Sequence, residues 1–153
     1  MSWLCWNVCG LGNLRTLREL EVVSRAKDPA AMFLAETWAK EARLRCLCSD
    51  LKFDHCWVGP SAGKTGCLVL LWKNSIRVEV VSSSPNHIDA VVGANPRDQW
   101  RFTGVYGFAD SSKKQETWSL LRGLHRVVSL PWLCASDFNE ILWSHEKLGR
   151  GPR

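Results

Sequence analysis

The sequence predicts an α/β fold, in which short buried strands alternate with amphipathic helices. Three features indicate this class: apolar runs of strand length, segments whose leucines recur with helical spacing, and a central stretch where apolar and polar residues alternate. The chain has 153 residues, of which 46% are hydrophobic and 23% charged. This composition is typical of one globular domain over residues 1–153, and no internal repeat or low-complexity linker divides it.

The first fifty residues predict the order strand, helix, strand, helix. The short apolar runs at 2–6 and 30–35 have the length of buried strands. A helix is expected between them, and Asp28-Pro29 ends it. Its apolar stripe consists of Leu14, Leu17, Leu20 and Val23. Residues 39–50 predict a second helix, with a buried face made of Ala42, Cys46 and Leu47.

Residues 53–107 predict strands in an antiparallel meander. Apolar and polar residues alternate there with a period of two, and Pro85 and Pro96, each beside an asparagine, supply turns. A third helix is expected over 112–129 and a last strand over 132–136. The buried stripe of the third helix would be Trp118, Leu121, Leu124 and Val128.

Composition argues against a membrane-spanning or secreted protein. The longest apolar runs fall well short of the roughly 20 residues that cross a bilayer, and the N-terminus lacks the pattern of a secretory signal. We therefore expect an intracellular location, nuclear or cytoplasmic. The seven cysteines show no C-x-x-C spacing, which favours structural free thiols. A net charge of +5 is compatible with a polyanionic partner but is common among ordinary domains.

Three predicted strands each end on a side chain that carries oxygen: Asn7, Glu36 and Asp137. Such side chains suit phosphodiester hydrolysis with Mg²⁺, which prefers oxygen ligands and usually one or two carboxylates. Glu36 and Asn7 fit the ligand role, and Asp137 fits the activation of water. Asn139 and Tyr106 fit the stabilisation of charge on phosphoryl oxygens. The alternative is that these residues end strands only for backbone hydrogen-bonding reasons.

Five short segments, taken together and in order, carry a family resemblance. They are Leu4–Gly12, Phe33–Thr37, Leu68–Trp72, Gly104–Gly107 and Ser136–Leu142. The chain resembles the endonuclease/exonuclease/phosphatase superfamily and is most similar to the apurinic-type endonuclease domain of plant LINE-type, non-LTR retrotransposons. The resemblance implies a two-sheet α/β sandwich with flanking helices and a hydrolase that uses Mg²⁺, or Mn²⁺ in its place. Nucleic acid is the implied partner, DNA more than RNA.

Residue by residue, the resemblance implies a metal site and a catalytic set. Asn7 and Glu36 would hold the metal, and Tyr106 would contact the phosphate. Asp137 would prepare the water, while Asn139 would support the transition state.

The chain also departs from the family pattern in two ways. Ser136 stands where the family usually has glycine, and the family's C-terminal half, with a further Ser-Asp-His segment, has no counterpart. We therefore expect the N-terminal portion of an incomplete, C-terminally truncated domain with impaired hydrolysis. The competing interpretation is a non-catalytic remnant of a retrotransposon that binds nucleic acid weakly.

Overall fold

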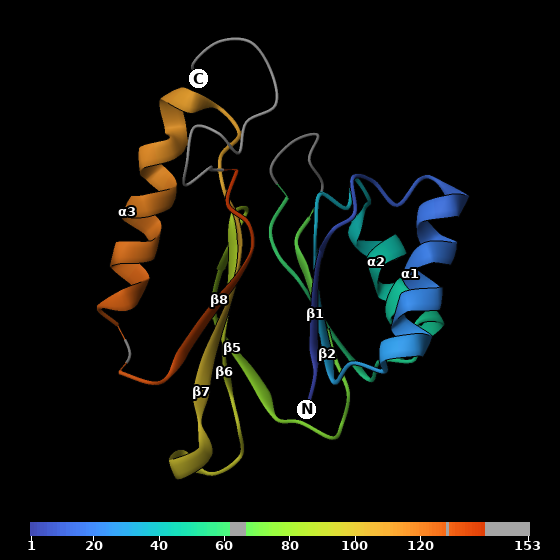
Figure 1. Cartoon of the computed structure of the whole chain (residues 1–153), viewed down its shortest axis with the longest axis horizontal. Helices are drawn as coiled ribbons and strands as arrows, with labels where there is room; N and C mark the ends of the chain where they lie inside the picture. Colours follow the sequence, from blue (N-terminus) through green and yellow to red (C-terminus); the bar gives the residue numbers. More distant parts are fainter. Residues whose placement is uncertain (62–66, 128, 140–153) are drawn as a thin grey trace.

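The computed structural model describes residues 1–61, 67–127 and 129–139. In these residues, two four-stranded sheets face each other as the layers of a sandwich (Figure 1). Helices cover both outer faces: α1 (Leu14–Lys27) and α2 (Glu41–Asp50) lie outside one sheet, and α3 (Lys114–His125) lies outside the other. The predicted two-sheet α/β sandwich with flanking helices is confirmed.

The first sheet has the strand order β1-β2-β4-β3. Its strands are β1 (Trp3–Asn7), β2 (Ala31–Ala35), β3 (His55–Val58) and β4 (Val69–Trp72). β1 runs parallel to β2, so that Asn7 lies opposite Ala35, and β4 is antiparallel to both β2 and β3. The parallel pair needs a crossover, which α1 supplies. This helix begins after Asn13, whose side chain accepts a hydrogen bond from the Arg15 N–H.

The second sheet has the strand order β5-β6-β7-β8. Its strands are β5 (Val78–Ser84), β6 (His87–Val92), β7 (Trp100–Tyr106) and β8 (Trp132–Asp137). β5, β6 and β7 form an antiparallel meander, with the 3₁₀ turn η2 (Pro96–Asp98) between β6 and β7. β8 runs parallel to β7, and the crossover passes through η3 (Ser111–Lys113) and α3. The register places Tyr106 opposite Asp137.

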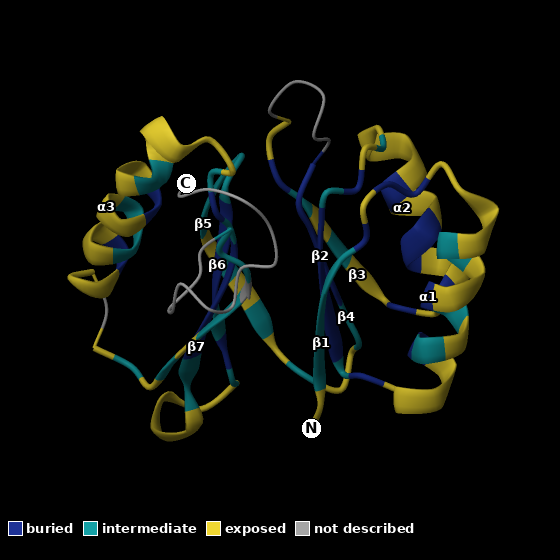
Figure 2. Ribbon diagram, turned by 45° about the horizontal axis from the view of Figure 1, so that its top comes forward, coloured by how far each residue is buried: buried dark blue, intermediate teal, exposed yellow. Residues whose placement is uncertain are grey.

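Two apolar clusters form the core, one on each face of the first sheet. Figure 2 shows buried residues on the strands and on the inward sides of the helices, and exposed residues on the helices' outer sides. The cluster between the sheets contains Phe33, Ala35, Leu68, Leu70, Ile88, Ala90, Val92 and Phe102. The cluster beneath α1 and α2 includes Leu20, Met32, Leu34, Leu44, Leu47, Val69 and Leu71.

The two sheets approach each other closely at a glycine. Gly104 of β7 faces Phe33 of β2, and a Cβ atom added to Gly104 would lie 2.3 Å from Cε2 of the Phe33 ring. A glycine inside a strand often marks such a close approach. The spacing of the layers at this point therefore depends on the missing side chain.

A buried polar network fastens α3 to the outer face of the second sheet. Arg101 donates to both carboxylate oxygens of Asp89 at 2.8 Å, and the two side chains are 1% and 2% exposed. Arg101 also donates to the Leu124 carbonyl in α3 and lies over the ring of Trp132 in β8. Thr103 donates to Asp89 and accepts from the Trp132 indole N–H. The network thus joins β6, β7 and β8 to the end of α3.

The expected meander over 53–107 is only partly correct. The turns at Pro85 and Pro96 and the antiparallel pairing of β5, β6 and β7 are confirmed. β3 and β4 belong to the first sheet, where β4 pairs with β2. The partner of a strand depends on long-range packing, and the alternation within the strand does not encode it.

Three expected helix faces also need correction. In α1, Leu14 is 71% exposed at the first residue of the helix, and Leu20 is the buried member of the predicted stripe. In α2, Ala42 and Cys46 are exposed, because the helix turns to bury the larger Leu44 at an i, i+3, i+4 spacing. Its buried residues are Leu44, Leu47 and Cys48. α3 ends at His125, earlier than predicted, and Trp118 is 38% exposed where it was expected in the core. Val128 lies outside the described residues.

The expectation of free thiols is confirmed, since all seven cysteines are free. Among the described residues, no helix has both the length and the apolar character needed to cross a membrane.

Candidate active site

The predicted site residues come from four strands that finish at the same end of the sandwich. β1 and β2 are a parallel pair in one sheet, and β7 and β8 are a parallel pair in the other, so each pair ends at one edge (Figure 1). Asn7, Tyr106 and Asp137 are the last residues of β1, β7 and β8, and Glu36 directly follows β2. The carboxyl ends of parallel strands are a common place for active sites in α/β folds.

One amide links these strand ends across the two layers. Nδ2 of Asn7 donates to Oε1 of Glu36 at 3.1 Å and to Oδ2 of Asp137 at 3.0 Å. The phenol of Tyr106 donates to the same Oε1 of Glu36 at 2.7 Å. The structure therefore brings together four of the five predicted residues in one hydrogen-bonded cluster, which we call the strand-end cluster.

Asn139, the fifth predicted residue, braces this cluster through the backbone. Its N–H donates to Oδ1 of Asp137 at 2.8 Å, and its Nδ2 donates to the Gly107 carbonyl at 2.7 Å. The Gly107 N–H in turn donates to the Asp137 carbonyl at 2.9 Å. Asn139 thus fixes the carboxylate of Asp137 and ties the segment after β8 to the end of β7.

The loops after β1 and β2 are bonded to each other. The N–H groups of Val8 and Gly10 donate to the carbonyls of Ala35 and Glu36 at 3.1 and 2.8 Å. Left-handed backbone is concentrated at this end of the molecule, at Cys9, Glu36, Trp38 and Asn139. Backbone strain of this kind gathers at functional sites, because surrounding contacts must hold it in place.

Two residues that touch the cluster were not predicted as site residues. Asn86, expected only as a turn residue, donates through Nδ2 to the Tyr106 carbonyl at 2.8 Å and accepts from the Tyr106 N–H at 2.9 Å. Cys9 donates through its N–H and its thiol to Oδ1 of Asn7, at 3.2 and 3.5 Å. The sequence carries no signal for either contact beyond the turn-forming Pro85-Asn86 pair.

The described part of the site contains two carboxylates. Among the described residues, neither Glu36 nor Asp137 forms an ion pair with a basic side chain. Burial, followed by the hydrogen bond to Glu36, raises the pKa of Tyr106 to about 12. Desolvation and then the negative charge of Glu36 raise the pKa of the Cys9 thiol. At neutral pH the phenol is therefore a hydrogen-bond donor to Glu36.

The donor set fits a hard divalent cation in part. Mg²⁺ is often held by one or two carboxylates, with water and substrate phosphate completing the shell. Glu36 and Asp137 supply two carboxylates, although no group of three or more His, Cys, Asp or Glu side chains in the described ranges forms a complete cage. Asn7 turns its nitrogen toward both carboxylates and its oxygen toward Cys9. To offer oxygen to a cation between the carboxylates, this amide must turn over.

The three histidines in the described part of the chain have partners outside the strand-end cluster. His55 pairs with Asn74 and stacks on Trp72, and His125 stacks on Trp132. His87 is buried between two serine hydroxyls, and its burial lowers its pKa. The fourth histidine, His145, lies outside the described residues.

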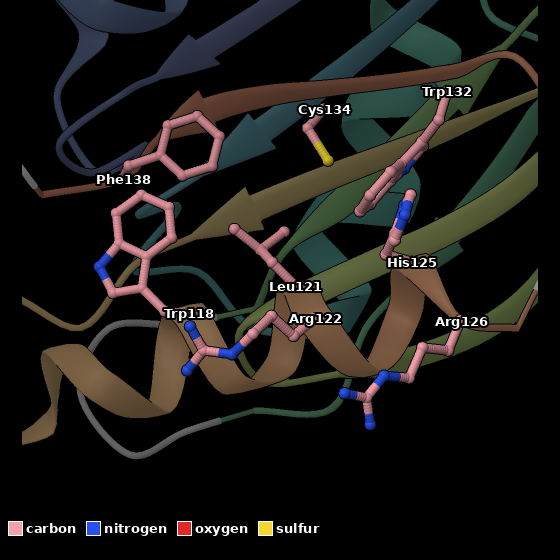
Figure 3. A pocket seen from close by; sticks show the side chains of 8 residues that line it. All are labelled: Trp118, Leu121, Arg122, His125, Arg126, Trp132, Cys134 and Phe138. Atoms are coloured by element: carbon pink, nitrogen blue, oxygen red, sulfur yellow. The ribbon is translucent and has the colours of Figure 1, made fainter.

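A separate apolar cavity of about 570 Å³ lies between α3 and β8 (Figure 3). Phe138 and Trp118 line one end, and His125 and Trp132 line the other. None of the five predicted residues lines it. The hydrogen-bonded geometry therefore places the candidate site at the strand ends and not in this cavity.

Comparison with known proteins identifies the fold. No protein-family model and no curated protein matches the sequence. Among solved structures, D. rerio TDP2 in complex with a single-strand DNA product matches with a TM-score of 0.67 and 15% identity, over 90% of this chain and 60% of that one. The endonuclease domain of TRAS1, a telomere-specific non-LTR retrotransposon, matches with a TM-score of 0.65 and 11% identity, over 91% and 61%. The catalytic domain of human Nocturnin matches with a TM-score of 0.60 and 14% identity, over 89% and 62%.

These likenesses establish the architecture. The chain has an endonuclease/exonuclease/phosphatase-type fold, and it spans about three fifths of the length of the three solved chains. The fold predicted from the five sequence segments is therefore confirmed.

Proposed function

We propose that the strand-end cluster is the core of a Mg²⁺-dependent phosphodiesterase site of the nuclease type. The observation that carries this proposal is the Asn7 amide, which bridges Glu36 and Asp137 although the three residues span 130 positions of sequence. Turn residues that merely end strands have no reason to bond to one another across two sheets. Their convergence favours a shared chemical task.

Glu36 and Asn7 are the proposed metal ligands, and Mn²⁺ suits the same oxygen donors as Mg²⁺. When bound, the cation would polarise a phosphoryl oxygen and neutralise the charge that develops on it. Within the described ranges the two carboxylates have no basic partner, which supports this assignment, because the charge of a divalent cation would relieve their repulsion.

Asp137 is the proposed base. Its carboxylate accepts hydrogen bonds from Asn7 and from the Asn139 backbone, which fix its orientation. In hydrolysis it would accept a proton from water while the water oxygen bonds to phosphorus and the phosphorus bond to the leaving oxygen breaks. Tyr106, whose phenol stays protonated at neutral pH, would donate to a phosphoryl oxygen, and the Asn139 amide would assist it.

DNA is the proposed substrate, in preference to RNA. Two of the structures with this fold are a TDP2 bound to single-strand DNA and a retrotransposon endonuclease domain. The net charge of +5 is compatible with a polyanion. An origin in a LINE-type element and an intracellular site of action are parts of the same proposal.

We further propose that turnover is slow. In the hydrogen bonds of the described ranges, the five residues are bonded to one another, to backbone and to the Cys9 thiol, so this part of the chain supplies a base but shows no cationic proton donor bonded to them for the leaving oxygen. A positioned acid or base typically contributes about 10² to 10⁴ in rate.

The test is nicking of supercoiled plasmid with Mg²⁺ or with EDTA, using Glu36→Gln, Asp137→Asn and the control Glu19→Gln. Glu19 is an exposed carboxylate of α1 that pairs with Arg15 and, within the described part of the chain, forms no hydrogen bond with the cluster residues. We expect Mg²⁺-dependent nicking by the wild type and by Glu19→Gln, and a loss of about 10² or more in the two site variants.

Metal binding is measured separately, by Mn²⁺ electron paramagnetic resonance on the same proteins. Glu36→Gln should weaken Mn²⁺ binding, whereas Glu19→Gln should not. Nicking that persists in both site variants would refute the assignment. Salt-sensitive DNA affinity without any nicking would instead favour the non-catalytic remnant.

A further inference from the structure

The loop that carries Glu36 also presents an exposed tryptophan. Trp38 lies two residues after Glu36, and 57% of its surface is accessible to solvent. Large aromatic side chains usually bury most of their surface or find a partner at an interface. An indole left open beside the strand-end cluster therefore calls for an explanation.

The indole is held in place by a glycine of the neighbouring loop. A Cβ atom at Gly10 would lie 2.4 Å from Cε3 of Trp38, so the ring packs directly on the Gly10 backbone. Gly10 has φ 97° and its N–H donates to the Glu36 carbonyl at 2.8 Å. The next N–H, of Leu11, donates to the carbonyl of Thr37 at 2.9 Å, and the Thr37 hydroxyl donates to the Cys67 carbonyl. One side of the ring thus packs on hydrogen-bonded loop backbone, and the rest of the ring is accessible to solvent.

The backbone at Trp38 is strained, and the contacts that maintain the strain also keep the indole in its exposed position. Its φ is 47°, in the left-handed region that bulky residues rarely adopt. Such a conformation persists only where the surrounding contacts over-determine it, and it is concentrated at functional sites. The chain therefore holds a rigid aromatic surface next to a proposed metal ligand.

We propose that Trp38 is a stacking platform for an unpaired nucleobase adjacent to the phosphodiester at the strand-end cluster. This inference rests on the proposed function and narrows its substrate to single-stranded or locally unpaired DNA. Every base offers a π-face to an aromatic side chain, so stacking tolerates any sequence. In a duplex both faces of a base are occupied by its neighbours, so only an unpaired base can use the platform freely.

Stacking would also provide affinity where the carboxylates of the cluster repel the phosphate of the substrate. The cluster carries two carboxylates without a basic partner in the described residues, so it repels a phosphate when no cation is bound. Contact with an uncharged base gives affinity that does not depend on phosphate neutralisation. The Trp38 contribution should therefore leave the salt dependence of binding unchanged, unlike the contribution of a lysine or arginine.

The experiment measures binding of fluorescein-labelled oligonucleotides by anisotropy, in EDTA, to the wild type, Trp38→Ala, Trp38→Phe and Trp57→Ala. Trp57 is the matched control, because it is 41% exposed but lies within β3, at the far edge of its sheet from β1. We expect Trp38→Ala to weaken single-strand binding roughly 5- to 150-fold at every salt concentration. Trp38→Phe should lose less, and Trp57→Ala should bind as the wild type does.

A second arm needs no variant. The wild type should bind a single strand more tightly than the corresponding blunt duplex. It should also bind single strands more weakly as more of their nucleotides are replaced by abasic spacers. Equal affinity for the intact and abasic strands, or equal losses in Trp38→Ala and Trp57→Ala, would overturn the proposal.

Failure of the phosphodiesterase proposal and failure of the stacking proposal give different results. If Glu36→Gln and Asp137→Asn leave nicking unchanged but Trp38→Ala still loses strand binding, the catalytic assignment is wrong and the platform stands. If the site variants lose nicking while Trp38→Ala binds normally, the platform is wrong and the catalytic assignment stands.

Discussion

Tyr106 shows how one side chain's environment sets its chemistry. Its phenol is partly buried at the end of β7 and donates to Glu36, and these two causes, burial first, raise its pKa to about 12. A phenol with an ordinary pKa near 10 would begin to lose its proton in mildly alkaline solution. Here the folded protein keeps the donor in place over a wider pH range.

We expect the titration of this phenol to be directly visible, because Tyr106 is the only tyrosine in the chain. The tyrosinate absorbance of the wild type, with Tyr106→Phe subtracted, should rise near pH 12 in the folded protein and near pH 10 in urea. The folded state binds this proton more tightly than the unfolded state. The stability it contributes is therefore present below about pH 10 and is lost as the pH rises toward 12.

Stability against urea at pH 9 and pH 11 checks the sign of this linkage. The wild type should lose more stability than Tyr106→Phe over that interval. A folded-state titration at the ordinary pH would show that the phenol is neither buried nor bonded to Glu36.

The residues of the strand-end cluster could be predicted individually, but their contacts could not. Asn7, Glu36 and Asp137 each follow an apolar strand, which is a local signal in the sequence. The direction of the Asn7 amide, with nitrogen toward both carboxylates, depends on the Cys9 N–H that holds its oxygen. Contacts made by a loop backbone in a left-handed conformation have no such local signal.

At the level of elements, the crossover helix α3 depends on the buried pair of Asp89 and Arg101. The guanidinium reaches from β7 to Asp89 in β6 and to the Leu124 carbonyl at the end of the helix. A buried pair of this kind is costly to break on one side only, because the remaining charge then lies unpaired in the interior.

Asp89→Asn should therefore lower the free energy of unfolding by about 3–5 kcal/mol, as measured by urea titration. The control is Glu41→Gln, which removes an exposed i, i+4 pair with Arg45 in α2 and should leave the free energy of unfolding close to that of the wild type. Equal effects of the two changes would mean that Arg101 finds other partners once Asp89 is neutral.

The difference between local sequence pattern and long-range packing explains which elements the sequence could predict. Helices and strands follow local periodicity, and the helix expected from Leu17 and Leu20 is observed as α1. The assignment of β3 and β4 to the first sheet, and the rotation of α2 that buries Leu44, depend on packing partners distant in sequence. No window of a few residues contains that information.

At the scale of the whole molecule, the site exists only because the two sheets stand at one particular separation. Asn7 and Glu36 belong to one layer, and Tyr106 and Asp137 belong to the other. Gly104 sets this separation two residues before Tyr106, where an added side chain would meet the Phe33 ring.

We expect Gly104→Ala to destabilise the protein by about 1–3 kcal/mol through overpacking and to weaken Mn²⁺ binding at the strand ends as well. Urea unfolding and Mn²⁺ resonance measure the two effects. Adding Phe33→Leu should recover part of both losses, since it shortens the side chain that the new methyl group meets.

Gly123→Ala in α3 is the matched control. A Cβ atom there meets nothing within 4 Å, and alanine favours the helix by up to about 1 kcal/mol. If Gly104→Ala behaved like Gly123→Ala, the layers would not be in contact at Gly104.

The amide of Asn7 is also a mechanical tie between the layers. Its nitrogen donates to one carboxylate from each sheet, and the Tyr106 phenol also donates across the layers to Glu36, so two uncharged donors hold the strand ends of the two sheets together. With a divalent ion held at Glu36, the Asn7 amide would no longer be needed as a donor there and could turn its oxygen toward the ion. Metal binding and the loss of the Asn7 hydrogen bonds would then occur together. Coordination to the cation would replace weaker hydrogen bonds within the protein.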